Sequence, residues 1–267
     1  MGADTKALRI RIKSVDSTLH LTKAMGLVAS SKIRRAGQAL SDGKAYAASL
    51  DALVEALTAG PECKKSRYMA ATGTRTCLVV IAGDRGLAGG YNANIFRLMR
   101  AYPDAKVYGI GKRACDRFGT APHSAEHFSG SEAFALAKEI CDDFLAGKFD
   151  RFGVVYTRYI SMMAQEATLS WLLPLTPPQH AKPSGIIFEP SEQEILGAAV
   201  PEYIAGKLSA FVRESFLSEV AARRMAMDSA SKNAQSMIDN LELSYNRARQ
   251  GAITQEITEI VAGSGNV

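Results

Sequence analysis

Proline is missing from both ends of this chain. All nine prolines fall between Pro61 and Pro201, so residues 1–60 and 202–267 contain none. A proline inside a helix costs about 3 kcal/mol, because it lacks the N–H donor and its ring clashes with the preceding turn. Two proline-free ends around a middle that holds every proline therefore predict two long helices flanking an inserted domain.

Long apolar runs and cysteine motifs are missing as well. The sequence has no run of 18 apolar residues, and its first segment lacks the apolar core of a signal peptide. Asp4 and Asp16 also argue against an organellar transit peptide. The four cysteines show neither a C-x-x-C pair nor metal-ligand spacing. This predicts buried or free thiols in a reducing cytoplasm and no direct membrane insertion.

Signals for nucleic acid and metal binding are weak. The net charge is only +5, and Tyr46 is the one aromatic residue among the first 57, whereas nucleic-acid-binding segments combine dense basic residues with aromatic or groove-reading elements. Only His123 and His127 are close together among the four histidines, and no third ligand follows them. We therefore expect no nucleic acid partner and no metal.

The two ends instead contain a seven-residue apolar repeat. Alternate steps of four and three from Leu8 keep one register for about seven heptads, which is typical of a coiled coil. The positions are Leu8, Ile12, Val15, Leu19, Thr22, Gly26, Ala29, Ile33, Ala36, Leu40, Gly43, Ala47, Leu50, Val54 and Leu57. The second end repeats the pattern at Val220, Arg224, Met227, Ser231, Ala234, Ile238, Leu241, Tyr245, Ala248 and Ala252. We expect an intramolecular, antiparallel coiled coil in which Leu19 and Ile33 are buried.

The middle of the chain has the alternation of an α/β domain. Apolar runs rich in β-forming residues predict strands at 76–82, 106–110 and 152–157, and a further edge strand at 165–175. Helices are expected at 93–101, 113–118 and 131–146. This order implies right-handed crossovers and a mainly parallel, Rossmann-like sheet.

The expected boundaries follow from turn and capping residues. Ser191 with Glu194 three residues later predicts the capped start of a short helix. Pro201 is expected to begin the long second helix at its first position. The chain then divides into a first helix at 1–58, an inserted α/β domain at 59–200 and a second helix at 201–267.

Two glycine patterns raise the alternative of a nucleotide-binding α/β enzyme with helical arms. Residues 83–90 follow a strand and precede a helix, but they lack the Gly-Lys-Ser/Thr of a P-loop. Residues 109–114 fit a relaxed G-x-G-x-x-A without a suitable acidic residue after the next strand. Tight strand-to-helix turns explain both patterns better, so we expect neither a catalytic residue nor a cofactor. A coiled-coil structural tether is a second alternative.

Three motifs in order resemble the γ subunit of F-type ATP synthases. They are Thr22-Lys-Ala-Met25 continuing to Arg34, Asp84-Arg-Gly-Leu-Ala-Gly-Gly90-Tyr-Asn92, and Tyr245-Asn-Arg-Ala-Arg-Gln250 continuing to Val261. The resemblance extends over the whole chain. It implies a central rotor shaft that stands inside a ring of three α and three β subunits, with its α/β domain bound to ε and the c-ring.

The resemblance also implies where the chain works. Rotation of the shaft would couple ion flow through the membrane sector to ATP synthesis or hydrolysis, and the catalytic residues would belong to the other subunits. The expected location is the cytoplasmic face of a bacterial cell membrane, as a peripheral subunit.

Contact residues carry over by position. On the first helix, Lys23, Met25 and the basic cluster Lys32, Arg34 and Arg35 match the region that passes an acidic loop of β, although a solvated helix face is the simpler interpretation of such a cluster. On the second helix, Arg223, Gln250, Thr254 and Glu256 match a face that contacts α and β. Glu189 matches a segment that meets the c-ring.

The sequence departs from the family pattern beside these residues. Gly26 follows Met25 where an acidic residue is common, and glycine weakens a helix by about 1 kcal/mol relative to alanine. Arg224 places a charge at a position of the second helix that is usually apolar. Phe188 replaces tyrosine before Glu189. The chain ends in Gly-Ser-Gly-Asn-Val instead of an alanine-rich apolar tip.

Overall fold

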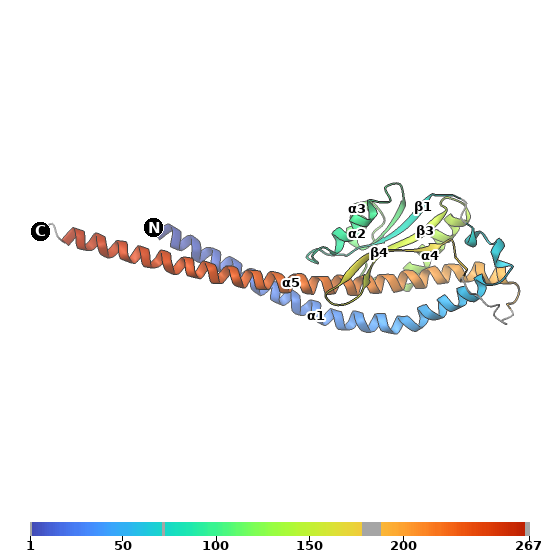
Figure 1. The fold of residues 1–267 in the computed structure, drawn as a ribbon, viewed down its shortest axis with the longest axis horizontal. Helices are drawn as coiled ribbons and strands as arrows, with labels where there is room; N and C mark the ends of the chain where they lie inside the picture. Colours follow the sequence, from blue (N-terminus) through green and yellow to red (C-terminus); the bar gives the residue numbers. More distant parts are fainter. Residues whose placement is uncertain (1, 71–72, 178–187, 265–267) are drawn as a thin grey trace. The chain divides into compact units, whose positions relative to one another are not determined.

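The computed structural model describes residues 2–70, 73–177 and 188–264. Two long helices dominate the chain: α1 runs over Gly2–Thr58 and α5 over Glu192–Ser264 (Figure 1). The chain divides into two compact units, one formed by residues 30–223 and the other by residues up to 29 together with those from 224 onward.

The first unit is built around a four-stranded sheet with the order β2-β1-β3-β4. Its strands are β1 (Thr76–Ile81), β2 (Lys106–Ile110), β3 (Arg151–Tyr159) and β4 (Gln165–Leu173). Strand β1 pairs in parallel with both β2 and β3, and β4 pairs antiparallel with β3 at the edge. The predicted mainly parallel sheet and its edge strand are confirmed.

Helices α2 (Tyr91–Met99), α3 (Lys112–Phe118) and α4 (Gly130–Leu145) lie close to the predicted ranges. Two short 3-10 helices, Cys63–Lys65 and Arg67–Met69, connect α1 to the sheet. Helix α4 starts at a capping box in which the Ser129 hydroxyl accepts from the Glu132 amide and the Glu132 carboxylate accepts from the Ser129 amide. The carboxylate and the hydroxyl therefore satisfy donors that the first helical turn leaves unpaired.

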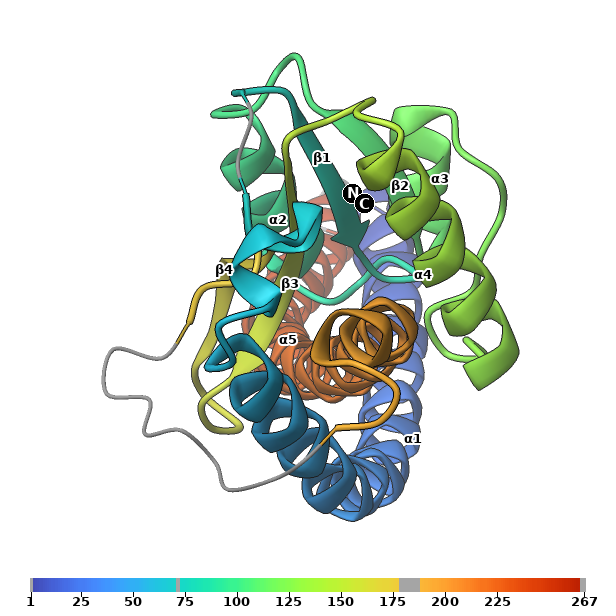
Figure 2. The same ribbon diagram turned by 90° about the vertical axis from the view of Figure 1, so that its right-hand side faces the viewer.

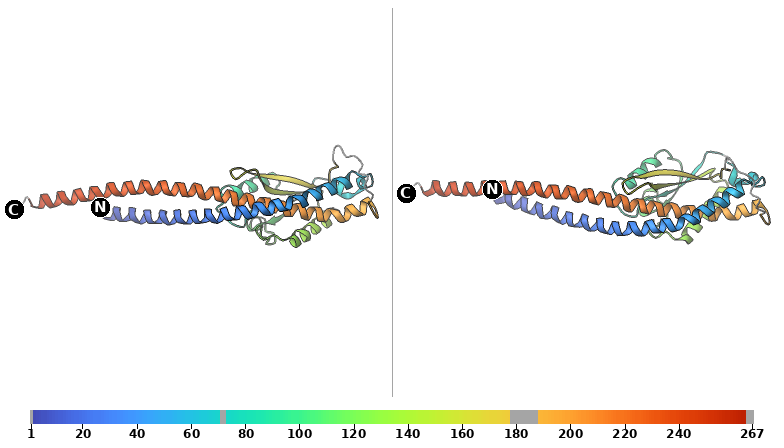
Figure 3. Two further views of the ribbon diagram at one scale, coloured as in Figure 1. Left: turned by 90° about the horizontal axis from the view of Figure 1, so that it is seen from below. Right: turned by 60° about the horizontal axis from the view of Figure 1, so that its bottom comes forward.

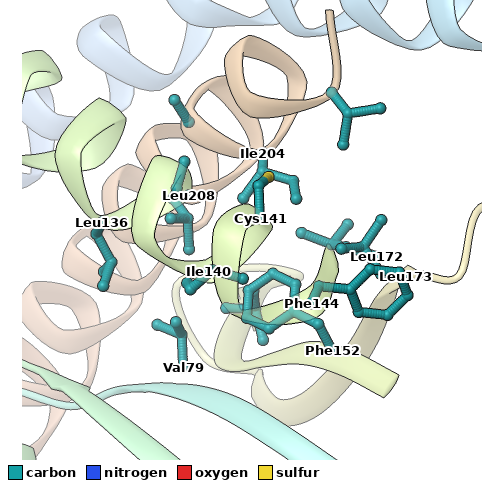
Figure 4. Close-up of a cluster of buried hydrophobic side chains, with 14 of the residues drawn as sticks. Val79, Leu136, Ile140, Cys141, Phe144, Phe152, Leu172, Leu173, Ile204 and Leu208 are labelled. Atoms are coloured by element: carbon teal, nitrogen blue, oxygen red, sulfur yellow. The ribbon is translucent and has the colours of Figure 1, made fainter. Parts of the chain in front are cut away.

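The sheet has an apolar core on each face. Alternate residues of β1 point to opposite sides, so Val79 belongs to one core and Val80 to the other. The larger core joins β1 and β3 to α4 and to the first turns of α5, and Phe144, Phe152 and Ile204 meet there (Figure 4). The other core packs α2 and α3 on the sheet. Viewed end-on, α5 lies between α1 and the sheet (Figure 2).

Helix α5 begins at Glu192, so the predicted start at Pro201 is wrong. The Glu194 amide donates to the Ser191 hydroxyl over 3.2 Å, which confirms the cap, but the helix that starts there is continuous and includes Pro201. Leu196 and Val200 are fully buried in the larger core. Their burial offsets the roughly 3 kcal/mol that proline costs inside a helix. The carbonyl that loses its donor belongs to exposed Gly197, where water can replace it.

The second unit is an antiparallel pair formed by the first part of α1 and the last part of α5 (Figure 3). Arg9 donates to the Tyr245 hydroxyl over 2.8 Å, and the Thr22 and Ser231 hydroxyls lie 2.8 Å apart. A later residue of α1 thus contacts an earlier residue of α5, so the two helices are antiparallel. Leu19 is buried against Ala234 and Ile238. The predicted register and direction are confirmed here.

The seam is less complete at Ile33, which lies in the α/β unit. Ile33 is only half-buried, whereas Ala36 one turn later is buried, so the prediction that Ile33 is buried is wrong. The small side chain at 36 allows close contact, and the longer one at 33 keeps part of its surface in water. All four cysteines are buried and free, as the sequence predicted.

Helix α5 contains an 18-residue window with a mean hydropathy of 1.3, which by length and composition alone would suffice for a membrane span. Of that window, 44% is buried inside the protein. A core helix passes the same test, so the window is weak support for a membrane segment.

Candidate functional site

The loop after β1, which carries the first glycine pattern, is organised by Asp84. One oxygen of its carboxylate accepts from the amides of Lys112 (2.9 Å) and Ala125 (3.1 Å). The other accepts from the Glu126 amide (3.0 Å) and the Ser124 hydroxyl (2.7 Å). Burial acts to raise the pKa of Asp84, but these hydrogen bonds outweigh it and the net shift is downward. A carboxylate of the chain itself thus occupies the start of α3, where a phosphate would bind in a nucleotide site.

The second glycine pattern serves backbone packing. Gly111 has a φ of +89°, and a Cβ there would lie 1.9 Å from the carbonyl oxygen of Ala82. A Cβ on Gly109 would lie 2.6 Å from the Thr120 hydroxyl and 3.0 Å from the Cys115 amide nitrogen. These contacts support the interpretation of the second pattern as close packing at a tight strand-to-helix turn.

Only part of the first pattern needs glycine for its backbone conformation. Gly89 has a φ of +57°, and Leu87 also has a positive φ of 61°. Gly90 has a φ of −83°, and Gly86 is not among the residues with positive φ. Gly86 and Gly90 therefore do not supply a positive φ, and the strain of the turn falls on a leucine instead.

Lys32 of the basic cluster is engaged inside the chain. Its ammonium forms an ion pair with the carboxylate of Glu126, and it lies 5.9 Å from the centre of the Phe216 ring of α5. The two charged side chains are 33% and 25% exposed. Arg34 and Arg35 are exposed. The cluster thus divides into one half-buried lysine with an internal partner and two arginines that face solvent.

Arg223 is also engaged inside the chain. Its guanidinium pairs with Glu219 one turn earlier and donates to the Gly86 carbonyl oxygen over 3.3 Å. The Glu219 side chain is only 4% exposed. Burial raises the pKa of Glu219, while the Arg223 guanidinium acts in the opposite direction. Gly83 makes room for this carboxyl group, since a Cβ there would lie 2.8 Å from its carbon.

The remaining residues of the first-helix group lie in the antiparallel pair. Lys23 is exposed and Met25 is half-buried. Gly26 faces Arg224, whose guanidinium nitrogen would lie 3.1 Å from a Cβ at that position. The glycine therefore gives the charged side chain of the opposite helix space to lie across α1, and a shallow groove runs beside it, lined by both helices.

The second-helix residues Gln250, Thr254 and Glu256 are exposed. The Thr254 hydroxyl donates to the backbone carbonyl of Gln250 over 3.0 Å. This bond lies within the helix and does not involve the side-chain amide of Gln250. Glu189 is exposed just before α5. The structure therefore does not gather the predicted residues into one pocket; they are distributed along two helices and one turn.

Possible metal ligands do not assemble in the part of the chain that the structure describes, where no group of three or more histidine, cysteine, aspartate or glutamate side chains could hold an ion. The Nδ1 atom of His123 lies 3.3 Å from a carboxylate oxygen of Glu132, and the Nε2 atom of His20 lies 3.7 Å from a carboxylate oxygen of Asp16. Each is a two-residue pair.

Comparison with known sequences decides the family. The sequence model of the ATP synthase family matches residues 4–266. The ATP synthase gamma chain of Ruminococcus albus is 38% identical over 282 residues, which cover 99% of each chain. That of Moorella thermoacetica is 38% identical over 278 residues, covering 98% of each. This chain belongs to the ATP synthase gamma chain family. It is the rotor subunit of an F-type ATP synthase and is not itself catalytic.

Solved structures agree on the fold. A chain of the Euglena gracilis mitochondrial ATP synthase superposes with a TM-score of 0.70 at 17% identity, covering 99% of this gamma chain and 95% of the other. A chain from the Tetrahymena thermophila central stalk and c-ring gives a TM-score of 0.62 at 21% identity, covering 79% and 99%.

The sequence points to Asp84 as part of a motif but does not reveal its four hydrogen-bond partners. Two further acidic residues of this gamma chain, Glu126 and Glu219, are not indicated by any motif of the sequence. They pair with Lys32 and Arg223 only in the folded chain, where residues far apart in sequence or on neighbouring helical turns come together. One signal was available: Glu219 precedes Arg223 by four residues on one helix, a spacing that favours an ion pair.

Proposed function

We propose that this gamma chain transmits torque between a c-ring and a ring of α and β subunits, with ε bound to its α/β unit. It would work as a peripheral subunit on the cytoplasmic face of a bacterial membrane. The observation that carries the proposal is the antiparallel pair of α1 and α5, which buries its seam through Leu19, Ala234 and Ile238 and leaves its outer faces exposed. Exposed faces along a helix pair are suited to contact another protein that surrounds the pair, whereas a substrate would need a pocket.

The far end of α5 supports insertion into a ring. Every described side chain from 253 to 262 is exposed, and the large apolar ones among them are Ile253, Ile257, Ile260 and Val261. Exposed apolar side chains in this number on a single helix indicate a surface that another protein covers. An apolar surface that the ends of the α and β subunits form around the helix would cover these side chains without fixing one rotational position. Gln250, Thr254 and Glu256 would add polar contacts there.

The proposed contact with an acidic loop of β rests on exposed cations. Lys23, Arg34 and Arg35 face solvent, and half-buried Met25 follows Lys23 two residues later on α1. Coulomb attraction falls slowly with distance, so it holds a moving contact without steric interlock. Lys32 contributes less to this surface, because its ammonium already has an internal partner. Exposed Glu189 is the proposed contact with the c-ring.

Reversing the three exposed cations together should lower the number of ions pumped per ATP hydrolysed by the reconstituted complex. Single exposed pairs are worth about 0–1 kcal/mol, so one alanine substitution should change the ratio little, whereas Lys23→Glu, Arg34→Glu and Arg35→Glu combined would add repulsion at each β subunit. The effect should shrink in high salt, because ions screen exposed charges.

Met25→Lys should lower the ratio of ions pumped per ATP hydrolysed by a different route, since an added cation would hold one β conformation too long.

The matched control reverses three exposed cations, which gives the same change in net charge: Arg97 on α2, Arg100 at the C-cap of α2, and Lys138 on α4. It should leave the ratio close to that of the unmodified complex. An unchanged ratio at low salt for both the triple reversal and Met25→Lys would exclude this surface as a torque contact.

A further inference from the structure

Lys32 and Arg223 reach from the two long helices to neighbouring loops at the carboxyl end of the sheet. We propose that they are positioning residues that fasten both helices of the shaft to the α/β unit, and that the working partner of Lys32 is Glu126 of the same chain. The role rests on the proposed torque transmission, which it deepens by naming where torque passes between the shaft and its own domain.

The partner of Lys32 is held in place by several bonds. Glu126 follows α3 in a loop whose amides at 125 and 126 both donate to Asp84, and whose Ser124 hydroxyl does the same. Asp84 itself comes shortly after the central strand β1. The Lys32–Glu126 pair therefore ties α1 to the centre of the sheet through a chain of hydrogen bonds rather than to a free loop.

Arg223 ties α5 to the same region. Its guanidinium donates to the Gly86 carbonyl, two residues after Asp84, and is itself held by buried Glu219. Glu219 lies close enough to both Asp84 and Glu126 for their charges to act on it. The groups that face it are thus Arg223, Asp84 and Glu126, so the network places two cations, Lys32 and Arg223, at a group of three carboxyl side chains.

The positions of the Lys32–Glu126 ion pair and the Arg223–Gly86 hydrogen bond along the two helices support this role. The compact α/β unit covers residues 30–223, so Lys32 lies two residues inside one end and Arg223 is the last residue at the other. Beyond these positions each helix belongs to the other unit. The network therefore involves residues near both ends of the range that the α/β unit covers, and within that unit it links α1 and α5 to the loops of the sheet.

A charge swap distinguishes this internal role from a contact with another subunit. Lys32→Glu and Glu126→Lys should each lower the ions pumped per ATP in the whole complex, by roughly two- to fivefold, which matches the lower range of couplings between contacting residues. The double variant, Lys32→Glu with Glu126→Lys, should recover most of the loss, because the pair is restored with its signs exchanged.

Arg34→Glu is the matched control, since Arg34 is a basic residue two positions away without an internal ion pair among the described residues. Adding Glu126→Lys to it should leave the ratio as low as in Glu126→Lys alone, because Arg34 is not the partner of Glu126. Should the variants assemble poorly, Lys32→Gln and Glu126→Gln would replace them, with hydrogen exchange of the amides at 125 and 126 as the readout, which should be faster in both.

Two outcomes would overturn the role. In one, Glu126→Lys has no effect and the double variant stays as defective as Lys32→Glu, which would assign Lys32 to another subunit. In the other, all the single variants couple normally and exchange is unchanged. Co-purification of each variant with α and β tests the proposed function separately, because it reports assembly regardless of how stiffly the shaft is held.

Discussion

Replacing Leu19 with aspartate should destabilise the antiparallel helix pair by about 3–5 kcal/mol. Truncating a buried leucine to alanine costs about 2–5 kcal/mol, and an aspartate adds a carboxylate that is desolvated without a partner. Leu19 is 4% exposed and packs on Ala234 and Ile238, with Ile12 and Val15 beside it. Helical circular dichroism during thermal unfolding should show this part of the chain melting well below the rest.

Leu21→Asp provides the control within the same helical turn. Leu21 is 59% exposed, so the substitution should change the free energy of unfolding by no more than about 0.5 kcal/mol. The aspartate at 19 should also impair assembly with α and β, whereas the one at 21 should impair it less. Equal stability of the two variants would mean that the seam is not formed as described.

Gly111→Ala should destabilise the α/β unit by about 3–5 kcal/mol. The backbone at Gly111 has φ +89° and ψ +137°, a region that residues with a Cβ avoid at a cost of about 1–3 kcal/mol. The new methyl group would also lie 1.9 Å from the Ala82 carbonyl oxygen, and overpacking costs about 1–3 kcal/mol more. Because the obstacle is backbone of the neighbouring strand end, a rotamer change cannot relieve it. Chemical denaturation measures the loss.

Gly119→Ala separates the two causes. Gly119 also has a positive φ, +65°, but no atom lies within 4 Å of the position of its Cβ. Only the conformational cost of about 1–2 kcal/mol should remain. If the two alanine variants unfold at the same denaturant concentration, the short distance from residue 111 to the Ala82 carbonyl oxygen adds nothing to the cost of a side chain there.

The parts of the fold that follow from local pattern were predictable. The heptad positions from Leu8 to Ala29 are all at least half-buried, because a repeat fixed by helix geometry determines which face is covered. The strands were found for a similar reason: short apolar runs such as 76–81 fill a parallel sheet that is covered on both faces.

The parts that depend on tertiary contacts were not predictable. Pro201 indicated a helix start, and only the burial of Leu196 and Val200 shows why the helix continues through it. The internal partners of Lys32 and Arg223 come from residues whose proximity depends on the complete fold. A basic cluster in sequence therefore could not reveal which of its members are available to another subunit.

Direct observation of rotation tests the central claim that this chain is a rotor. A probe attached through Lys138→Cys on the exposed side of α4 would report its motion against an immobilised ring of α and β subunits. The native cysteines would not compete strongly, since all four are buried and burial raises the pKa of Cys77 and of Cys141 to about 12. On addition of ATP the probe should turn in one direction with three pauses per revolution. ATP hydrolysis at an undiminished rate with a stationary probe would contradict the account.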